Sequence, residues 1–227
     1  MLVAIAIGVS GCATWTPSSM WPSSMWPASA GGKAATEPDP YGPTADKRMA
    51  KLTADAKTAK AGSPETHEAF TRQLVEMMLS EHDPRVRCRI LEVAAEFDTP
   101  TAVAICTGAL QDPDERVRMA ACSAWGRRGG PEAIDLLAAR YQNDPELDVR
   151  LRAIRALGEL HDMAAVPVLA KALEDGDPAV QYRAVAALKQ ASGRDLGNDV
   201  NRWREWAADP EGSGAEWSIA EAFRRFF

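Results

Sequence analysis

Histidines are the residues of this chain best suited to acid–base or metal chemistry, and there are three of them: His67, His82 and His161. They fall at different phases of a repeating pattern, so we do not expect their side chains to converge on one site. The sequence also contains no glycine-rich phosphate loop, no zinc-ligand spacing and no nucleophile elbow. We therefore predict no catalytic, cofactor-binding or metal-binding residues.

Cysteines are the second group that could do chemistry. Cys88, Cys106 and Cys122 fall inside predicted helices and form no Cys-x-x-Cys pair. Three cysteines do not make a disulfide framework, and free cysteine is most often a small buried apolar residue. We expect buried packing for these three, with a reactive thiol or a single bridge as the alternative.

Cys12 stands apart, at the end of an apolar run over 2–11. The run is too short to span a membrane, which takes about 20 helical residues, and is typical of a signal-peptide core. Its end, Val9-Ser10-Gly11-Cys12, resembles a bacterial lipobox. The resemblance implies a lipoprotein signal peptide at 1–11 and a membrane-anchoring lipid on Cys12. No Lys or Arg precedes the run, which leaves open a translation start upstream or a chance apolar stretch.

The segment after Cys12 is rich in Pro, Ser and Trp and contains Pro-Ser-Ser-Met-Trp twice in tandem. Such a composition cannot build a core, so residues 12–45 are expected to be a disordered tether. Trp15, Trp21 and Trp26 would suit a membrane–water interface, or have no role. A possible basic helix or linker follows at 46–62.

A fixed period in the middle of the chain is marked by four Asp-Pro dipeptides. The valines that follow them, at 86, 117, 149 and 180, are spaced by 31, 32 and 31 residues. Small or apolar residues four, seven and eight positions after each valine make one apolar helix face. Partner helices are predicted before them, over 65–80, 101–110, 131–141 and 164–173. The period predicts an all-α fold, a short right-handed α-solenoid of about four helix pairs over 63–192.

The helix ends have their own signals. The aspartate of each Asp-Pro is expected to cap the second helix of its pair. Gly126 and Gly158 are expected to end two of the second helices.

Helix pairs joined by Asp-Pro…Val-Arg-x-x-Ala-x-x-Ala-Leu-Gly resemble HEAT repeats, of the short kind also found in phycobilin lyases. The resemblance implies that a ladder of Asp and Arg side chains links successive units. Arg87, Arg118 and Arg150 would occupy the ladder positions, while Gln181 would break it in the last unit. These charged residues are therefore interpreted as structural.

Residues 193–227 lie beyond the repeat and are interpreted as a C-terminal cap and an amphipathic tail. A predicted helix over 200–208 carries Trp203 and Trp206, which suit the exposed end of a solenoid. The loop leading into Trp-Arg-x-Trp resembles the ending of HEAT proteins from planctomycete-type bacteria. The tail over 216–227 could pack on the cap, enter a partner's groove or touch a membrane.

The variable positions of the second helices are the remaining candidates for function. In HEAT solenoids these helices line the concave side, where an apolar column flanked by arginines would suit a peptide or protein. The chain's own termini could instead cover this surface. The candidate partner-binding residues are Met119, Leu151, Tyr182, Arg152, Arg155 and Arg183.

The net charge of −6 and the pI near 5.2 argue against nucleic-acid binding. Together these patterns predict a membrane-anchored scaffold of the bacterial cell envelope that binds another protein. The alternatives are a HEAT-type lyase or metal-dependent enzyme, and a purely structural envelope component. HEAT-type hydroxylases hold two irons with several His-Glu pairs, whereas His67-Glu68 is a single pair.

Overall fold

The computed structural model describes residues 42–210, so the lipobox, the tether and the amphipathic tail lie outside the described residues. The described part contains ten α-helices, one short 3₁₀ helix and no strand, which confirms the all-α prediction. No helix within it is long and apolar enough to cross a membrane. The helices are α1 (Ala45–Lys60), α2 (Pro64–Ser80), α3 (Pro84–Ala94), α4 (Pro100–Ala109), α5 (Glu115–Arg128), α6 (Pro131–Asn143), α7 (Leu147–Glu159), α8 (Val166–Ala172), α9 (Pro178–Ser192) and α10 (Val200–Ala208).

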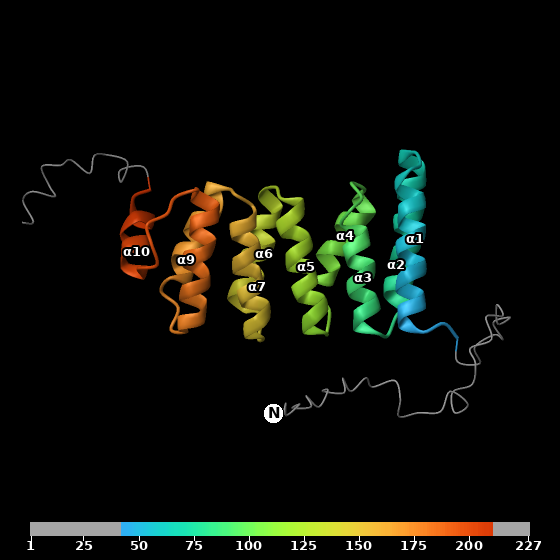
Figure 1. Cartoon of the computed structure of the whole chain (residues 1–227), viewed down its shortest axis with the longest axis horizontal. Helices are drawn as coiled ribbons and strands as arrows, with labels where there is room; N and C mark the ends of the chain where they lie inside the picture. Colours follow the sequence, from blue (N-terminus) through green and yellow to red (C-terminus); the bar gives the residue numbers. More distant parts are fainter. Residues whose placement is uncertain (1–41, 211–227) are drawn as a thin grey trace, which may run out of the picture. The chain divides into compact units, whose positions relative to one another are not determined.

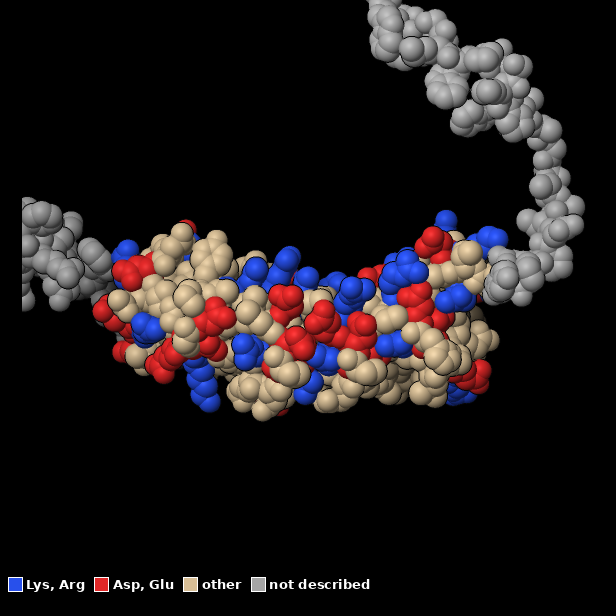
Figure 2. Space-filling model, turned by 90° about the horizontal axis from the view of Figure 1, so that it is seen from below, with Lys and Arg blue, Asp and Glu red and all other residues tan. Residues whose placement is uncertain are grey.

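Helices α2 to α9 form four successive pairs, as the period predicted (Figure 1). We call α3, α5, α7 and α9 the second helices; each packs against its own partner and against the second helices beside it. The last pair departs from the prediction, because the helix expected over 164–173 is divided into a 3₁₀ turn, Met163–Ala165, and the short α8. Figure 2 looks onto the edge at which the second helices begin, where acidic and basic side chains alternate.

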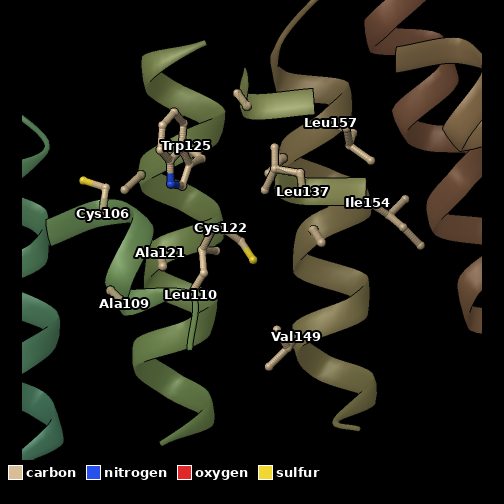
Figure 3. Packing of buried hydrophobic residues seen from close by; sticks show 14 of the residues in the cluster. Cys106, Ala109, Leu110, Ala121, Cys122, Trp125, Leu137, Val149, Ile154 and Leu157 are labelled. Carbon is tan, nitrogen blue, oxygen red and sulfur yellow. The ribbon is translucent and has the colours of Figure 1, made fainter. Parts of the chain in front are cut away.

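The core lies between the two layers of helices and is built from the predicted apolar positions. The four aligned valines, Val86, Val117, Val149 and Val180, are all fully buried. Figure 3 shows the buried side chains around α5 and α7, where small and branched residues fill the space between helices. Alanines four and seven positions after the valines, such as Ala153 and Ala156, let neighbouring helices approach closely.

Two glycines expected to end helices serve a different purpose. Helix α5 continues past Gly126 to Arg128, and α7 continues past Gly158 to Glu159. A Cβ on Gly126 would lie 3.0 Å from the Cβ of Ala156, and one on Gly158 would lie 2.7 Å from the Cα of Ala187. The prediction of helix ends was therefore wrong: these glycines allow neighbouring second helices to touch.

Helix α1 joins the solenoid, although the sequence set residues 46–62 apart. It packs against α3 and α2 and buries Leu52, Ala56 and Ala59. Its remaining surface is polar, which suits an end helix with no unit before it. Helix α1 therefore packs in front of α3, at the start of the row of second helices.

At the other end, α10 covers α8 and α9. Trp203 is fully buried and Trp206 nearly so, with their rings packed edge to face at 5.5 Å between centroids. The indole N–H of Trp203 donates to the carbonyl of Gly197 at 2.9 Å, which fixes the loop before the helix.

Candidate functional site

The predicted ladder arginines lie along the edge where the second helices begin. Arg87 donates from Nε and Nη2 to the carboxylate of Asp112, at 3.0 and 2.8 Å. Arg118 binds Asp144 in the same two-pronged way, at 2.9 Å for both bonds. The Nη1 group of each arginine donates to backbone carbonyls of the turn before its own helix. Each arginine therefore ties its own turn to the next unit.

An additional rung joins α1 to the first pair. Arg48 donates from Nε and Nη2 to Glu81, at 3.0 and 3.1 Å, and from Nη1 to the carbonyl of Pro43. The sequence interpretation missed this rung because no Asp-Pro precedes Arg48 and the acceptor is a glutamate. A usable signal was the distance from the cap: Arg48 stands four residues after Thr44, as Arg87 stands four after Asp83.

The Asp-Pro motif combines two structural roles that the sequence treated as one. Asp83 caps α3 and Asp177 caps α9, accepting from backbone N–H groups as expected. Asp112 and Asp144 do not cap a helix; they lie two residues before the caps and accept the arginines. The capping prediction was therefore wrong for these two residues.

The ladder ends one unit earlier than predicted. Among the described residues, no hydrogen bond or ion pair engages the side chain of Arg150, and its Nε is buried without a partner. Asp175, which stands where Asp144 stands in the unit before, instead accepts from the backbone N–H of Asp177 at 2.9 Å. Gln181 donates to the carbonyl of Asp175 at 2.7 Å, so it retains the turn contact but binds no carboxylate.

Asp144 is the most deeply buried carboxylate of the ladder, with its side chain fully inaccessible. Arg140 also approaches it, with Nη1 3.4 Å from Oδ2. Burial raises the pKa of Asp144, but hydrogen bonds from Arg118 and the Glu146 backbone, with the charges of both arginines, lower it further than burial raises it. The carboxylate is thus held ionised between two cations, as a structural link requires.

The histidines and cysteines lie in separate surroundings. His67 packs edge-on against Phe97, while Nδ1 of His161 lies 3.0 Å from the carbonyl of Gln190. Burial raises the pKa of the Cys88 and Cys106 thiols to about 11 and that of Cys122 to about 12. All three cysteines are free thiols. Within residues 42–210 no three His, Cys, Asp or Glu side chains are grouped to hold a metal.

Two hollows lie side by side on the second helices, and we call them together the second-helix groove. One, of about 170 Å³, is lined by Met119, Asp148, Leu151, Arg152, Arg155 and Arg183. The other, of about 350 Å³, is lined by Cys88, Glu92, Arg116, Met119, Ala120, Ser123, Arg127 and Arg152. Met119 and Arg152 line both, so the groove runs across the second helices from α3 to α9.

Five of the six predicted partner-binding residues line this groove, and Tyr182 does not. Tyr182 is 66% exposed and stands outside both hollows, because beyond α9 there is no further second helix against which it could pack. The sequence interpretation missed Arg116 and Arg127, which line the groove. They stand one residue before and ten after Val117, outside the positions compared between units.

Four arginines of the groove have no partner in the described part of the chain. No hydrogen bond or ion pair there engages the side chains of Arg116, Arg127, Arg152 or Arg183. By contrast, Arg155 is paired with Glu159 at 2.7 Å. The face that looks toward the reader in Figure 1 forms the upper outline of Figure 2, where Lys and Arg side chains gather.

A further hollow, separate from the second-helix groove, lies between α2 and α4; it has a volume of about 340 Å³ and is mostly apolar. Leu79 on its rim is 83% exposed. Gly108 lines it, and Arg140 stands at the matching position of the next unit, where Nη1 reaches back 3.0 Å to the carbonyl of Leu110. A Cβ on Gly108 would meet nothing within 4 Å. Gly108 therefore leaves space in the hollow that a side chain at this position would enter.

Comparisons with known proteins bear on the fold. A family model for HEAT repeats matches residues 71–151 and 138–211, which is more than half of the chain. No curated protein matches the sequence. Among solved structures, human deoxyhypusine hydroxylase in complex with glycerol matches with 21% identity and a TM-score of 0.49. The match covers 55% of this chain and 44% of that chain, so it spans less than half of the enzyme's length.

Proposed function

Because the chain belongs to the HEAT repeat family, we propose that it is an interaction scaffold that binds another protein in the second-helix groove. We further propose that a lipid on Cys12 holds it at a membrane of the bacterial cell envelope.

The observation that carries this proposal is the continuity of the second-helix groove. Hollows shared through Met119 and Arg152 join several units into one surface, which is how solenoids present a site to an extended partner. The ladder supports the same assignment, because its arginines are occupied by structural contacts and are not available to a ligand. The groove is built from positions of the second helices that differ between units, such as Cys88, Met119 and Leu151.

A pulldown from native cells tests the proposed groove. Met119 and Leu151 are changed together to Glu, which puts charge on the apolar floor. The matched control changes Leu79 and Ala104 to Glu, on the hollow between α2 and α4. We expect the first variant to lose the partner and the control to retain it. Equal recovery by both variants would remove the groove from the proposal.

Mass spectrometry of the mature amino terminus tests the proposed anchor. We expect a mature chain that begins at Cys12 and carries acyl groups, since more than one chain is needed for stable anchoring. An unmodified Cys12 that still follows Gly11 would refute the anchor and leave the groove untouched.

The enzyme alternative makes a separate prediction. A HEAT-type lyase would carry a tetrapyrrole, and a metal-dependent enzyme would carry stoichiometric metal. An absorbance scan and elemental analysis of the purified protein distinguish both from a scaffold.

A further inference from the structure

We propose that the segment bound in the second-helix groove is acidic, with Asp or Glu side chains on either side of an apolar one. This inference rests on the proposed function and names the chemistry of the partner. It follows from the charges, the geometry and the floor of the groove.

The charge of the groove differs in sign from that of the chain. The chain as a whole has a net charge of −6. The groove, in contrast, is lined by five arginines and only two carboxylates, Glu92 and Asp148. A positive surface on an acidic protein draws in a negatively charged partner and repels like-charged surfaces.

Most of the groove arginines have no hydrogen-bond or ion-pair partner among the described residues. The ladder arginines Arg87 and Arg118 each hold a carboxylate with two bonds. The groove arginines Arg116, Arg127, Arg152 and Arg183 have no such partner among the described residues. Guanidinium groups donate paired hydrogen bonds to carboxylates, so each of these four can bind a carboxylate of a partner.

The spacing of the groove arginines suits an extended peptide. Arg152 and Arg183 occupy the same position on the neighbouring helices α7 and α9, and packed helices lie about 8–10 Å apart. In an extended peptide, side chains alternate between two faces, so residues four apart lie on one face, about 13 Å from each other, with one residue of that face between them. Acidic residues at that interval would reach both arginines, because the long arginine side chains span the remaining difference. Anionic charge spread along a peptide fits this arrangement better than a single phosphate group.

The floor of the groove between the arginines is apolar. Met119 is half-buried and lines both hollows, and Leu151 lies beside it on α7. A methionine floor adapts to differently shaped apolar side chains. The groove therefore has a place for one apolar residue between acidic ones, which a nucleic-acid backbone does not supply.

Selection from a random peptide library against the purified full chain tests the inference. The test variant carries Arg152→Glu with Arg183→Glu. The control carries Arg72→Glu with Arg202→Glu, which changes the net charge equally at exposed positions outside the groove. We expect the wild type and the control to enrich acidic peptides. We expect the test variant to bind those peptides about tenfold or more weakly and to shift its preference toward basic ones.

The possible outcomes separate the two proposals. The selected peptides could show no acidic bias and still bind the Arg152→Glu, Arg183→Glu variant. That result would overturn the acidic partner and leave the scaffold function in place. Failure to enrich any peptide would overturn both. Enrichment of sequences matching residues 216–227 would assign the groove to the chain's own tail and overturn an external acidic partner.

Discussion

At the scale of single residues, the chain uses arginine in two ways, in ion pairs between units and on the open groove. Arg118 and Arg152 both lie on second helices, one and three residues after the aligned valine of their unit. Arg118 is buried against Asp144, while Arg152 lines an open groove without a partner. Burial and pairing, which depend on where each helix begins and what lies beside it, make the first arginine structural and leave the second on the proposed binding surface.

Changing Asp144 to Asn tests the structural assignment. The change would leave Arg118 and Arg140 buried without a carboxylate, so we expect a loss of about 3–5 kcal/mol in the free energy of unfolding at neutral pH. Urea denaturation measures this loss. Asp83→Asn is the matched control, because asparagine caps a helix as well as aspartate does. Equal losses in the two variants would mean that the buried ladder contributes nothing beyond an ordinary cap.

The pH dependence of stability follows from the same residue. The pKa of Asp144 in the folded chain lies below its ordinary value of 3.8, so the folded state releases this proton more readily than the unfolded state. The stabilisation is therefore fully present well above pH 3.8 and is lost as the pH falls through the folded-state pKa. We expect unfolding free energies measured between pH 6 and 2 to fall less steeply in Asp144→Asn than in the wild type.

At the scale of the elements, glycine has opposite roles in two helices. Gly158 allows α7 to touch α9, whereas Gly108 in α4 faces open space. We expect Gly158→Ala to destabilise the fold by about 1–3 kcal/mol, because the added methyl group would force the helices apart. We expect Gly108→Ala to stabilise it by up to about 1 kcal/mol, because alanine favours helix and meets no obstacle. Thermal or urea unfolding of the two variants gives the signs, and two changes of the same sign would contradict this account.

Helix α1 is predicted to stabilise the units that follow it. Leu52 is 1% exposed, and Leu52→Ala should cost about 2–5 kcal/mol locally. Because each unit of a solenoid contacts only its neighbours, the effect should concentrate near that end. We expect faster hydrogen exchange over α1, α2 and α3 and little change over α9. Lys51→Ala, at an exposed position of the same helix, is the control. If Leu52→Ala left hydrogen exchange unchanged, α1 would be a linker that does not stabilise the solenoid.

The helix pairs and their apolar faces could be predicted from the sequence because they depend on local periodicity. The links between units could be predicted only in part. Arg87 with Asp112 and Arg118 with Asp144 join residues 25 and 26 positions apart, and identifying both partners requires the start of each helix. The same limit explains why Arg48 was missed, why Arg150 was wrongly assigned an ion pair and why Tyr182 was placed in the groove.

At the scale of the whole molecule, the described residues form one stack of helices that carries two open surfaces. The second-helix groove is lined by unpaired arginines, and the hollow between α2 and α4 is mostly apolar. We propose that the partner binds in the second-helix groove and not in the apolar hollow. Because its arginines are partly exposed, we expect the affinity for an acidic partner to fall as salt rises, whereas apolar contacts with Met119 and Leu151 would persist.

Site-specific photocrosslinking in the native cell tests the central claim most directly. A photoreactive residue replaces Met119 in the groove or Ala104 on the hollow between α2 and α4. We predict a discrete crosslinked partner from position 119 and none from position 104. A chain that crosslinks equally from both positions, or only from position 104, would contradict the assignment of binding to the second-helix groove.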